Sequence, residues 1–352
     1  MSNVKIKVFG LGGGGGNAVD KMIDMDIANV DFYVANTDMQ ALKKSKCTNK
    51  LCIGEKTTKG LGAGADPLIG SKAARETEME IRKVLEDTDM VFLAAGLGGG
   101  TGTGAIPIVA GIAKEMGILT VAIVTKPFSF EGPKRRNQAN QGFEKLMASA
   151  DSVISISNNQ LMRMIGRKPI KEAFMACDNV LTQGVCTITD LIQIPSLINL
   201  DFADVKTTLS NQGFAVLGIG QASGEDKANK AAEQAVIPSL LEKDISGARN
   251  AIVNVTGGMD MSLMDVEDAV ATIKDAAGVD IDIIFGTAIN PNLNDEIIVT
   301  VIATGFDDAD TVLEKSKKKL DSVMGLAKKH ILSENEEEMI PGFFRGHTAP
   351  IY

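Results

Sequence analysis

Three glycine-rich stretches are the parts of this sequence whose residue types could hold a charged ligand. The stretch AAGLGGGTGTG (94–104) puts six glycines into nine positions and contains no lysine. Glycines let a ligand approach the backbone closely, and amides at a helix N-terminus favour an anion. GLGGGGG (10–16) and GLGAGADP (60–67) are similar, and no G-x-x-x-x-G-K-[ST] motif is present. Three such loops suit a triphosphate held almost wholly by backbone amides.

One carboxylate-bearing segment could act on such a ligand. NLDFADV (199–205) places Asn199, Asp201 and Asp204 around a helix that we expect to start near Ala203. Two carboxylates at this spacing can face one small volume, where they could orient a water molecule or hold a cation. Helix capping explains Asp201 or Asp204 equally well. The only histidines are His330 and His347, so the body of the chain cannot use histidine-based catalysis or a histidine-bound metal.

A dinucleotide site is the alternative for the first glycine run. Gly10, Gly12 and Gly15 satisfy G-x-G-x-x-G, a weak signal when it stands alone. An acidic residue is then expected at the end of the second strand, to bind a ribose hydroxyl. That strand ends with Asn36, and Asp38 lies two residues beyond, so the alternative stays open.

The elements that would position these residues alternate in type along the first half of the chain. β-Branched and apolar runs predict buried strands, and helix-length amphipathic segments lie between them. The strands are expected at 5–10, 32–36, 90–96, 119–125 and 152–157; helices are expected from near Asn17 and at 71–87 and 105–116. This alternation predicts an α/β fold with a parallel sheet covered on both faces.

The second half has a different pattern. A long helical pattern covers 170–194 and is stopped by Pro195. Strands are then expected at 214–220, 250–258, 282–289 and 296–305, with helices at 226–243 and 264–277. Two helices for four strands predict an α+β domain with some antiparallel pairing.

Composition narrows the class of partner. Of 352 residues, 44% are hydrophobic and 23% charged, the net charge is −9, and the four cysteines show no zinc spacing. An acidic chain is a poor partner for nucleic acid or an anionic membrane surface. We expect a cytosolic protein with reduced thiols, no signal peptide and no membrane-spanning segment.

The last part of the chain changes in composition. Residues 309–332 are lysine-rich with a narrow apolar stripe, which indicates a solvated spacer helix or, less strongly, a partner-binding one. Phe343 and Phe344 follow the charged run ENEEE. Two aromatic residues in such a tail favour a peptide that docks into a partner's groove.

The stretch GGGTGTG (98–104) resembles the signature of the tubulin/FtsZ superfamily, and the whole chain resembles its FtsZ branch, the bacterial cell-division GTPases. The resemblance continues in VFGLGGGGGNAV (8–19), ANTDMQAL (35–42), GLGAGADP (60–67), PFSFEGPKR (127–135), NLDFADVKT (199–207) and IPGFFR (340–345). It implies a Rossmann-like GTPase domain (1–169), a central core helix (170–195) and a C-terminal α+β domain (196–306). A spacer (307–339) and a partner-binding tail (340–352) follow.

The resemblance also implies roles for single residues. Gly13, Gly14 and Asn17 would surround the α- and β-phosphates, and the Gly62–Ala63–Gly64 loop would close on the γ-phosphate. The loop that holds the β- and γ-phosphates would comprise Gly98, Gly99, Gly100, Thr101, Gly102, Thr103 and Gly104, with hydroxyl donors from its two threonines. Pro127, Glu131 and Arg135 would lie at the sugar and phosphates. Asn158 and Asp178 would read guanine while Phe174 stacks on it, although Asn179 could replace Asp178 in that role.

The implied activity is GTP hydrolysis coupled to assembly. Asn199, Asp201 and Asp204 would form a synergy loop that reaches into the nucleotide pocket of the next subunit in a head-to-tail filament. Mg²⁺ would be held mainly by nucleotide and water, with no metal site built from protein ligands. The protein would act in the cytoplasm at the division site, and Ile340–Arg345 would bind membrane-tethering proteins. A filament scaffold without turnover is disfavoured, because all three synergy-loop residues are present.

Overall fold

The computed structural model describes residues 4–25, 27, 29–165, 169–193, 201–237, 244–278, 280–291 and 293–306. The chain divides into two parts, Met1–Phe306 and Asp307–Tyr352. Every described residue belongs to the first part. The predicted spacer and tail, with Phe343 and Phe344, therefore lie outside the described residues.

A parallel sheet forms the first half of the described chain, as the sequence predicts. Its strands are β1 (Ile6–Leu11), β2 (Val30–Asn36), β3 (Asn49–Cys52), β4 (Met90–Gly96), β5 (Leu119–Lys126) and β6 (Ser152–Ser157). They lie in the order β3-β2-β1-β4-β5-β6, and each neighbouring pair is parallel. The carboxyl ends of all six strands therefore meet at one edge of the sheet, where ligands of such folds bind.

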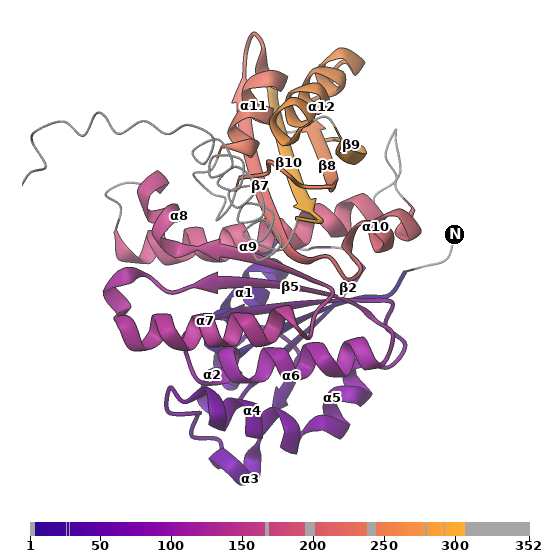
Figure 1. Ribbon diagram of the computed structural model, residues 1–352. Coiled ribbons are helices and arrows are strands. Elements are labelled where there is room, and N and C mark those ends of the chain that lie inside the picture. The colour runs from indigo at the N-terminus through magenta and orange to yellow at the C-terminus, as the bar shows by residue number, and fades with distance from the viewer. Residues whose placement is uncertain are drawn as a thin grey trace, which may run out of the picture. The chain divides into compact units, whose positions relative to one another are not determined.

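Helices cover both faces of this sheet (Figure 1). The helical segments are α1 (Gly12–Asp24), α2 (Met39–Lys44), α3 (Glu55–Thr58), α4 (Pro67–Glu76), α5 (Glu78–Leu85), α6 (Thr101–Glu115), η1 (Ser129–Glu131), α7 (Pro133–Met147) and α8 (Asn158–Ile165). In β1, Ile6 and Val8 pack toward α1, while Phe9 and Leu11 pack toward the face that α4 to α7 cover. This alternation explains why β1 is apolar on both faces, with Lys7 as its one charged residue.

The first helix begins earlier than expected. The sequence predicts a start near Asn17, but α1 begins at Gly12, so glycines form its first turn. Glycine has a low helix propensity, and packing overrides it here. A Cβ built on Gly15 would lie 2.1 Å from the carbonyl oxygen of Ala94, because the helix backbone rests directly on β4. Only glycine allows that approach.

The helix predicted at 71–87 is two helices, because α4 and α5 meet at Thr77. The buried Thr77 hydroxyl donates to the Ala73 carbonyl oxygen (3.2 Å) and accepts from the Gly54 N–H (2.9 Å). A threonine whose hydroxyl bonds the backbone four residues earlier disturbs the helical hydrogen-bond ladder. Amphipathic periodicity continues through such a break, so the pattern does not reveal it.

The second half is a mixed α+β region, also as predicted. The helix α9 (Ile170–Gln193) leads to it, and the gap at 194–200 separates α9 from α10 (Phe202–Leu209). The remaining elements are β7 (Gly213–Ser223), α11 (Lys227–Val236), β8 (Asn250–Gly257), α12 (Leu263–Ala277), β9 (Asp282–Ile289) and β10 (Glu296–Thr304). The strand β10 pairs antiparallel with β7 and β8, whereas β8–β9 and β6–β7 are parallel.

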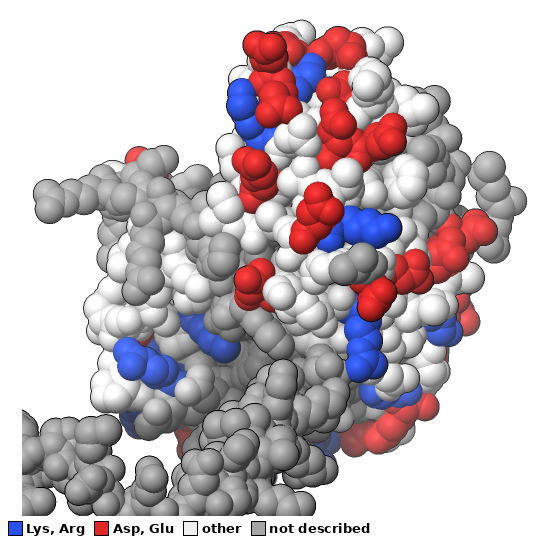
Figure 2. All heavy atoms as spheres, turned by 45° about the horizontal axis from the view of Figure 1, so that its top comes forward, with Lys and Arg blue, Asp and Glu red and all other residues white. Residues whose placement is uncertain are grey.

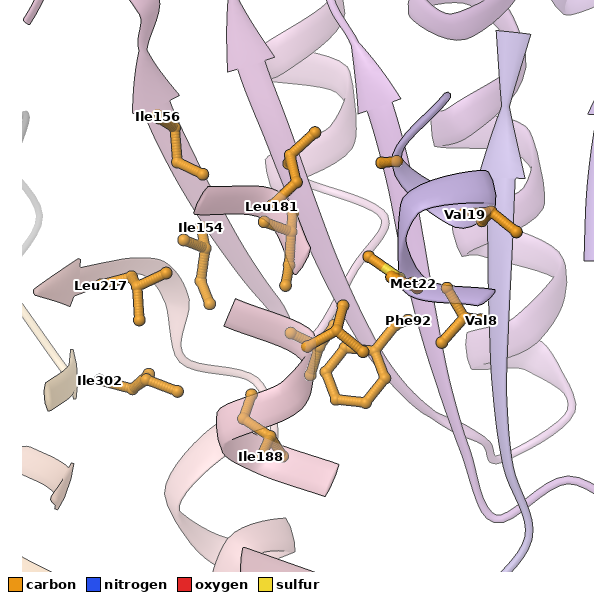
Figure 3. Packing of buried hydrophobic residues seen from close by; sticks show 14 of the residues in the cluster. Val8, Val19, Met22, Phe92, Ile154, Ile156, Leu181, Ile188, Leu217 and Ile302 are labelled. Atoms are coloured by element: carbon orange, nitrogen blue, oxygen red, sulfur yellow. The ribbon is translucent and has the colours of Figure 1, made fainter. Parts of the chain in front are cut away.

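One apolar cluster joins the two halves around α9. Leu181 and Ile188 of α9 belong to the same buried cluster as Phe92 of the parallel sheet and Leu217 and Ile302 of the second half. Figure 3 shows the two α9 side chains among those of the parallel strands, with Leu217 and Ile302 to the left of the view. The helix is thus a shared core element, and truncating it should weaken both halves.

The surface of the second half is acidic. Figure 2 shows Asp and Glu side chains gathered over the part that carries α11 and α12. Exposed members of this group are Glu225, Asp226, Asp260, Glu267 and Asp268. This face has the wrong charge for the backbone of a nucleic acid.

Candidate functional site

A cavity of about 390 Å³ opens at the carboxyl ends of β1, β4 and β5, within the range typical of small-molecule sites. Its lining is Gly13, Gly14, Asn17, Gly96, Leu97, Gly99, Gly100, Thr101, Gly102, Thr125, Pro127, Glu131, Arg135, Asn158, Cys177 and Asp178. A smaller hollow of about 200 Å³ shares Asn17 and Asp178 with it. The structure therefore brings together most of the residues that the sequence singled out.

The glycines at this cavity are of two kinds. A Cβ built on Gly13 or on Gly99 meets no atom within 4 Å, so these two positions leave open space at the ligand side. A Cβ on Gly102 would lie 2.9 Å from the Gly96 carbonyl oxygen, and one on Gly12 would lie 2.8 Å from the Gly102 nitrogen. The N-termini of α1 and α6 are thereby held side by side, and their amides can converge on one anion.

Two residues of the second glycine stretch do not line the cavity. The Thr103 hydroxyl is buried and accepts from the Gly98 N–H (2.8 Å). A Cβ on Gly104 would lie 2.0 Å from the Pro67 carbonyl oxygen, and the Gly104 N–H donates to the Gly100 carbonyl oxygen. Both residues instead line a separate cavity of about 600 Å³. Thr103 and Gly104 therefore shape the loop from behind, and their expected place at the phosphates stays a prediction.

Gly98 is absent from the lining as well. Its φ of +99° lies in the left-handed region, and a Cβ there would lie 3.0 Å from the Arg135 carbonyl oxygen. Gly98 thus turns the chain beneath the cavity rather than at its surface.

The third glycine stretch stands beside the second without lining the cavity. The Gly62 N–H donates to the Thr37 carbonyl oxygen (3.0 Å), and Leu61 forms an antiparallel bridge with Asp38. A Cβ on Gly100 would lie 2.8 Å from the Ala63 methyl group, so the two loops pack without space between them. The closing of Gly62–Gly64 on a phosphate stays a prediction.

Two hydrogen-bond acceptors mark the opposite end of the cavity. The Asn158 side chain is 6% exposed, and its Oδ1 has no hydrogen-bond partner among the described residues. Burial raises the pKa of Asp178 to about 6 and that of the neighbouring Cys177 to about 12. An orphaned amide oxygen and a half-buried carboxylate are suited to a ligand that brings N–H donors, as guanine does. Phe174 lies in α9, but its side chain is outside the described part.

A charged pair lies at the rim. Arg135 in α7 forms an ion pair with Glu131, whose other carboxylate oxygen accepts from the Phe128 N–H (2.9 Å). The Arg135 side chain is half exposed, whereas that of Glu131 is mostly buried. Glu131 therefore fixes the guanidinium at the cavity, where it can meet the charge of a phosphate.

The acidic residue of the dinucleotide alternative is engaged in helix capping. Asp38 caps α2, with Oδ1 accepting from the N–H groups of Gln40 (2.8 Å) and Ala41 (3.3 Å). Asn36 is buried, and its Oδ1 accepts from the Asp38 N–H (3.2 Å). Both side chains are thus engaged locally, although both also line a cavity of about 340 Å³ beside Gly12 and Gly13.

The carboxylates of the 199–205 segment lie far from this cavity. Asp201 and Asp204 are exposed at the start of α10. Asp201 occupies the N-cap position, yet its side chain makes no capping hydrogen bond, so capping does not account for it. In α9, Gln193 follows Asp178 by fifteen residues, which is roughly 22 Å of helix. Asn199 lies outside the described residues.

Four lining residues were not among the predicted site residues: Gly96, Leu97, Thr125 and Cys177. Gly96 and Thr125 stand at the carboxyl ends of β4 and β5, which was the available signal. Cys177 could have been found as the neighbour of Asp178. Within the described ranges, no group of three or more His, Cys, Asp or Glu residues could hold a metal ion. None of the described helices has the length and apolar character needed to cross a membrane.

Comparison with known proteins agrees with this geometry. Residues 5–166 match the GTPase domain of the Tubulin/FtsZ family, and residues 213–307 match the C-terminal domain of the FtsZ family. The solved structure of an empty FtsZ dimer from M. jannaschii is 41% identical over 86% of this chain and 88% of that one, with a TM-score of 0.82. A GTPgS-bound protofilament of CetZ2 from Haloferax volcanii is 21% identical over 91% and 100%, with a TM-score of 0.75, and shares the fold.

Proposed function

Because this chain belongs to the tubulin/FtsZ family and carries its GTPase domain, we propose that it hydrolyses GTP while assembling into head-to-tail filaments. The observation that carries the proposal is the separation of its two chemical parts. The cavity holds the anion-binding amides, whereas Asp201 and Asp204 stand beyond the far end of α9. One subunit alone therefore cannot bring both parts to one ligand.

The cavity fits a guanine nucleotide along its length. Amides at the N-termini of α1 and α6 would receive the phosphates, where Gly13 and Gly99 leave room for them. The Asp178 carboxylate would accept from guanine N1–H and N2–H₂, and Asn158 would supply its orphaned oxygen. Adenine offers no such donor pair, so the site should prefer GTP and GDP to adenine nucleotides.

Hydrolysis needs a water molecule placed in line with the terminal phosphate. The side chains of Asp201 and Asp204 are exposed and have no hydrogen-bond or ion-pair partner among the described residues. Free carboxylates of this kind can orient and polarise water in the pocket of a neighbouring copy. Mg²⁺, held mainly by the nucleotide and water, would neutralise charge on the phosphate oxygens. The site would exist only where two subunits meet, and hydrolysis would be coupled to assembly.

Exposed apolar side chains support contact between copies. Leu61 (84% exposed) and Leu68 (73%) flank the Gly62–Gly64 loop, while Met259 (79%), Leu263 (75%) and Met264 (71%) precede or begin α12. Clustered exposure of large apolar side chains is typical of interaction surfaces. Two different surfaces in contact make a heterologous interface, which propagates into an open filament. The dimer of M. jannaschii FtsZ supports self-association in this family.

We also infer a cellular role, which the family membership supports. Such filaments would form the division ring at the septum, in the cytoplasm, and Ile340–Arg345 would bind the proteins that tether the ring to the membrane. Removing residues 340–352 should then leave polymerisation nearly intact and abolish recruitment by a tethering partner. A loss of GTPase activity in that truncation would place the tail in the core instead.

One assay tests the central proposal. Light scattering and phosphate release are recorded together after GTP is added to the purified protein with Mg²⁺, and parallel samples receive GDP, ATP or NAD. GTP alone should produce scattering and phosphate, with turnover per subunit rising as protein concentration enters the assembling range. Phosphate release at full rate from dilute, non-scattering protein would refute the shared site. Scattering without phosphate would indicate a scaffold instead of an enzyme.

A further inference from the structure

One buried hydroxyl pair joins the loops around the phosphate end of the cavity. The Thr37 side chain, immediately after β2, is 0% exposed, and its Oγ1 lies 2.6 Å from Oγ1 of Thr101, the first residue of α6. Thr101 lines the cavity, whereas Thr37 does not. The Thr37 hydroxyl thus touches the site only through Thr101.

The backbone of Thr37 holds a second loop. Its carbonyl oxygen accepts from the Gly62 N–H (3.0 Å), and it shares the Thr58 hydroxyl (3.3 Å) with the Gly54 carbonyl oxygen (3.0 Å). Thr58 in turn accepts from the Gly60 N–H (3.3 Å). A single buried residue therefore fastens the 60–64 loop with its carbonyl and the start of α6 with its hydroxyl.

Thr101 lies at the end of the cavity farthest from the base. Asn17 shares a hollow with Asp178, whereas Gly12, five residues earlier in α1, packs against Thr101. Five helical residues span about 7.5 Å. A nucleotide whose base meets Asp178 would therefore direct its terminal phosphate toward Thr101 and the adjoining 60–64 loop.

We propose that Thr37 is a positioning residue that makes the site prefer a nucleoside triphosphate to a diphosphate, an inference that rests on the nucleotide site described under Proposed function. A hydroxyl has one proton to donate and two lone pairs that accept. When Thr37 donates to Thr101, the Thr101 proton is free to point into the cavity at a phosphate oxygen. Such a chain of hydrogen bonds ending on an anion is cooperative and charge-assisted. Thr37 also fixes how far the start of α6 stands from the 60–64 loop.

The test compares nucleotide affinities of variants at one matched position. Thr37→Val keeps the shape and removes the hydroxyl, whereas Thr37→Ser keeps the hydroxyl. Equilibrium dissociation constants for GDP and for a non-hydrolysable GTP analogue are measured on full-length protein too dilute to assemble. We expect Thr37→Val to weaken analogue binding about tenfold and GDP binding less than about twofold. Thr37→Ser should retain the wild-type ratio of the two affinities.

Two controls separate positioning from general packing. Thr120 at the start of β5 is equally buried, and its hydroxyl bonds only the backbone oxygen of Ile118 (2.9 Å), so Thr120→Val should leave the affinity ratio unchanged. In a Thr101→Val background, Thr37→Val should have no further effect on the ratio, because the hydroxyl acts through Thr101.

Each result has a definite meaning. Equal weakening of both ligands, an unchanged ratio in Thr37→Val, or additive effects in the double variant would overturn the inference. If Thr37→Val does not fold, Thr37→Ala takes its place: the ratio must fall in Thr37→Ala and hold in Thr37→Ser. Wild-type protein that binds neither nucleotide would refute the proposed function itself.

Discussion

GTP binding should weaken when the pH falls below about 6, because the base-reading carboxylate must be ionised. Burial raises the pKa of Asp178 from its ordinary value of 3.8 to about 6 in the free protein. The carboxylate is then ionised in roughly ten molecules of eleven at pH 7 and one of eleven at pH 5. Only the ionised form can accept from both guanine donors. Since the apparent dissociation constant scales inversely with the competent fraction, affinity should fall about tenfold between pH 7 and pH 5.

The contribution of the same group to stability has the opposite sign. A carboxyl whose pKa is higher in the folded than in the unfolded state binds more protons when folded. The contribution of Asp178 to the free energy of unfolding therefore rises as the pH falls from about 6 toward 4. Acid weakening of GTP binding in this range would thus not reflect loss of the fold through Asp178.

The assay is a titration of GDP and GTP analogue binding between pH 5 and 8, at constant ionic strength and without assembly. Phosphate groups of the ligand also titrate, so the wild-type profile is divided by that of Asp178→Asn. Asp190, in the same helix, provides the matched control, because burial raises its pKa to about 6 as well and it does not line the cavity. The affinity of wild type divided by that of Asp178→Asn should change about tenfold between pH 7 and pH 5, and so should the affinity of Asp190→Asn divided by that of Asp178→Asn. A flat quotient would refute the assignment of Asp178 as the acceptor.

Four further predictions test other parts of the structure. Gly99→Ala adds a methyl group to open space at the cavity, so it should weaken nucleotide binding while changing stability by less than about 0.5 kcal/mol in denaturant melts. Gly102→Ala should weaken nucleotide binding too, and in addition lower the free energy of unfolding by about 1–3 kcal/mol, because its Cβ meets the Gly96 carbonyl oxygen. Equal free energies of unfolding for Gly99→Ala and Gly102→Ala would contradict this. Asp204→Ala should bind GTP and assemble but release little phosphate, and mixing it with Gly102→Ser subunits that co-sediment with it should restore part of the activity. Leu181→Ala should lower the free energy of unfolding by about 2–5 kcal/mol and leave one cooperative unfolding transition, because the substitution opens a cavity in the core that both halves share. Two separate unfolding transitions would show that the halves unfold independently.

The fold was predictable where burial shows directly in the sequence. Strands such as β4 are apolar at every position because helices cover both faces of the sheet, and such an apolar run clearly predicts a buried strand. The strand β3 was missed because NKLC lies at the sheet edge and is half polar. Helix starts were displaced at glycines, where contact with β4 rather than propensity decides the conformation. Local pattern carries no information about such contacts.

The site was predictable in its residue types but not in which residues face the ligand. Threonine alternates with glycine through 101–104, and the pattern alone cannot tell that Thr101 faces the cavity while Thr103 faces away. Which one does is set by α4, whose Pro67 and Ser71 pack against Gly104. Thr37 could not be singled out for a related reason, since its partner Thr101 lies 64 residues away.

The two ends of the cavity would bind the ligand through different groups, and this explains why they differ in sequence pattern. In the proposed site the phosphates would be held by backbone amides, so that end is marked in the sequence by runs of glycine, which has no side chain. In the proposed site the base would be read by two side chains that look ordinary in the sequence. Burial gives Asp178 its raised pKa and leaves the Asn158 oxygen without a partner among the described residues. Backbone amides do not titrate near neutral pH. Sensitivity to pH in the protein's own groups should therefore arise at the base end, while sensitivity to added side-chain bulk should arise at the phosphate end.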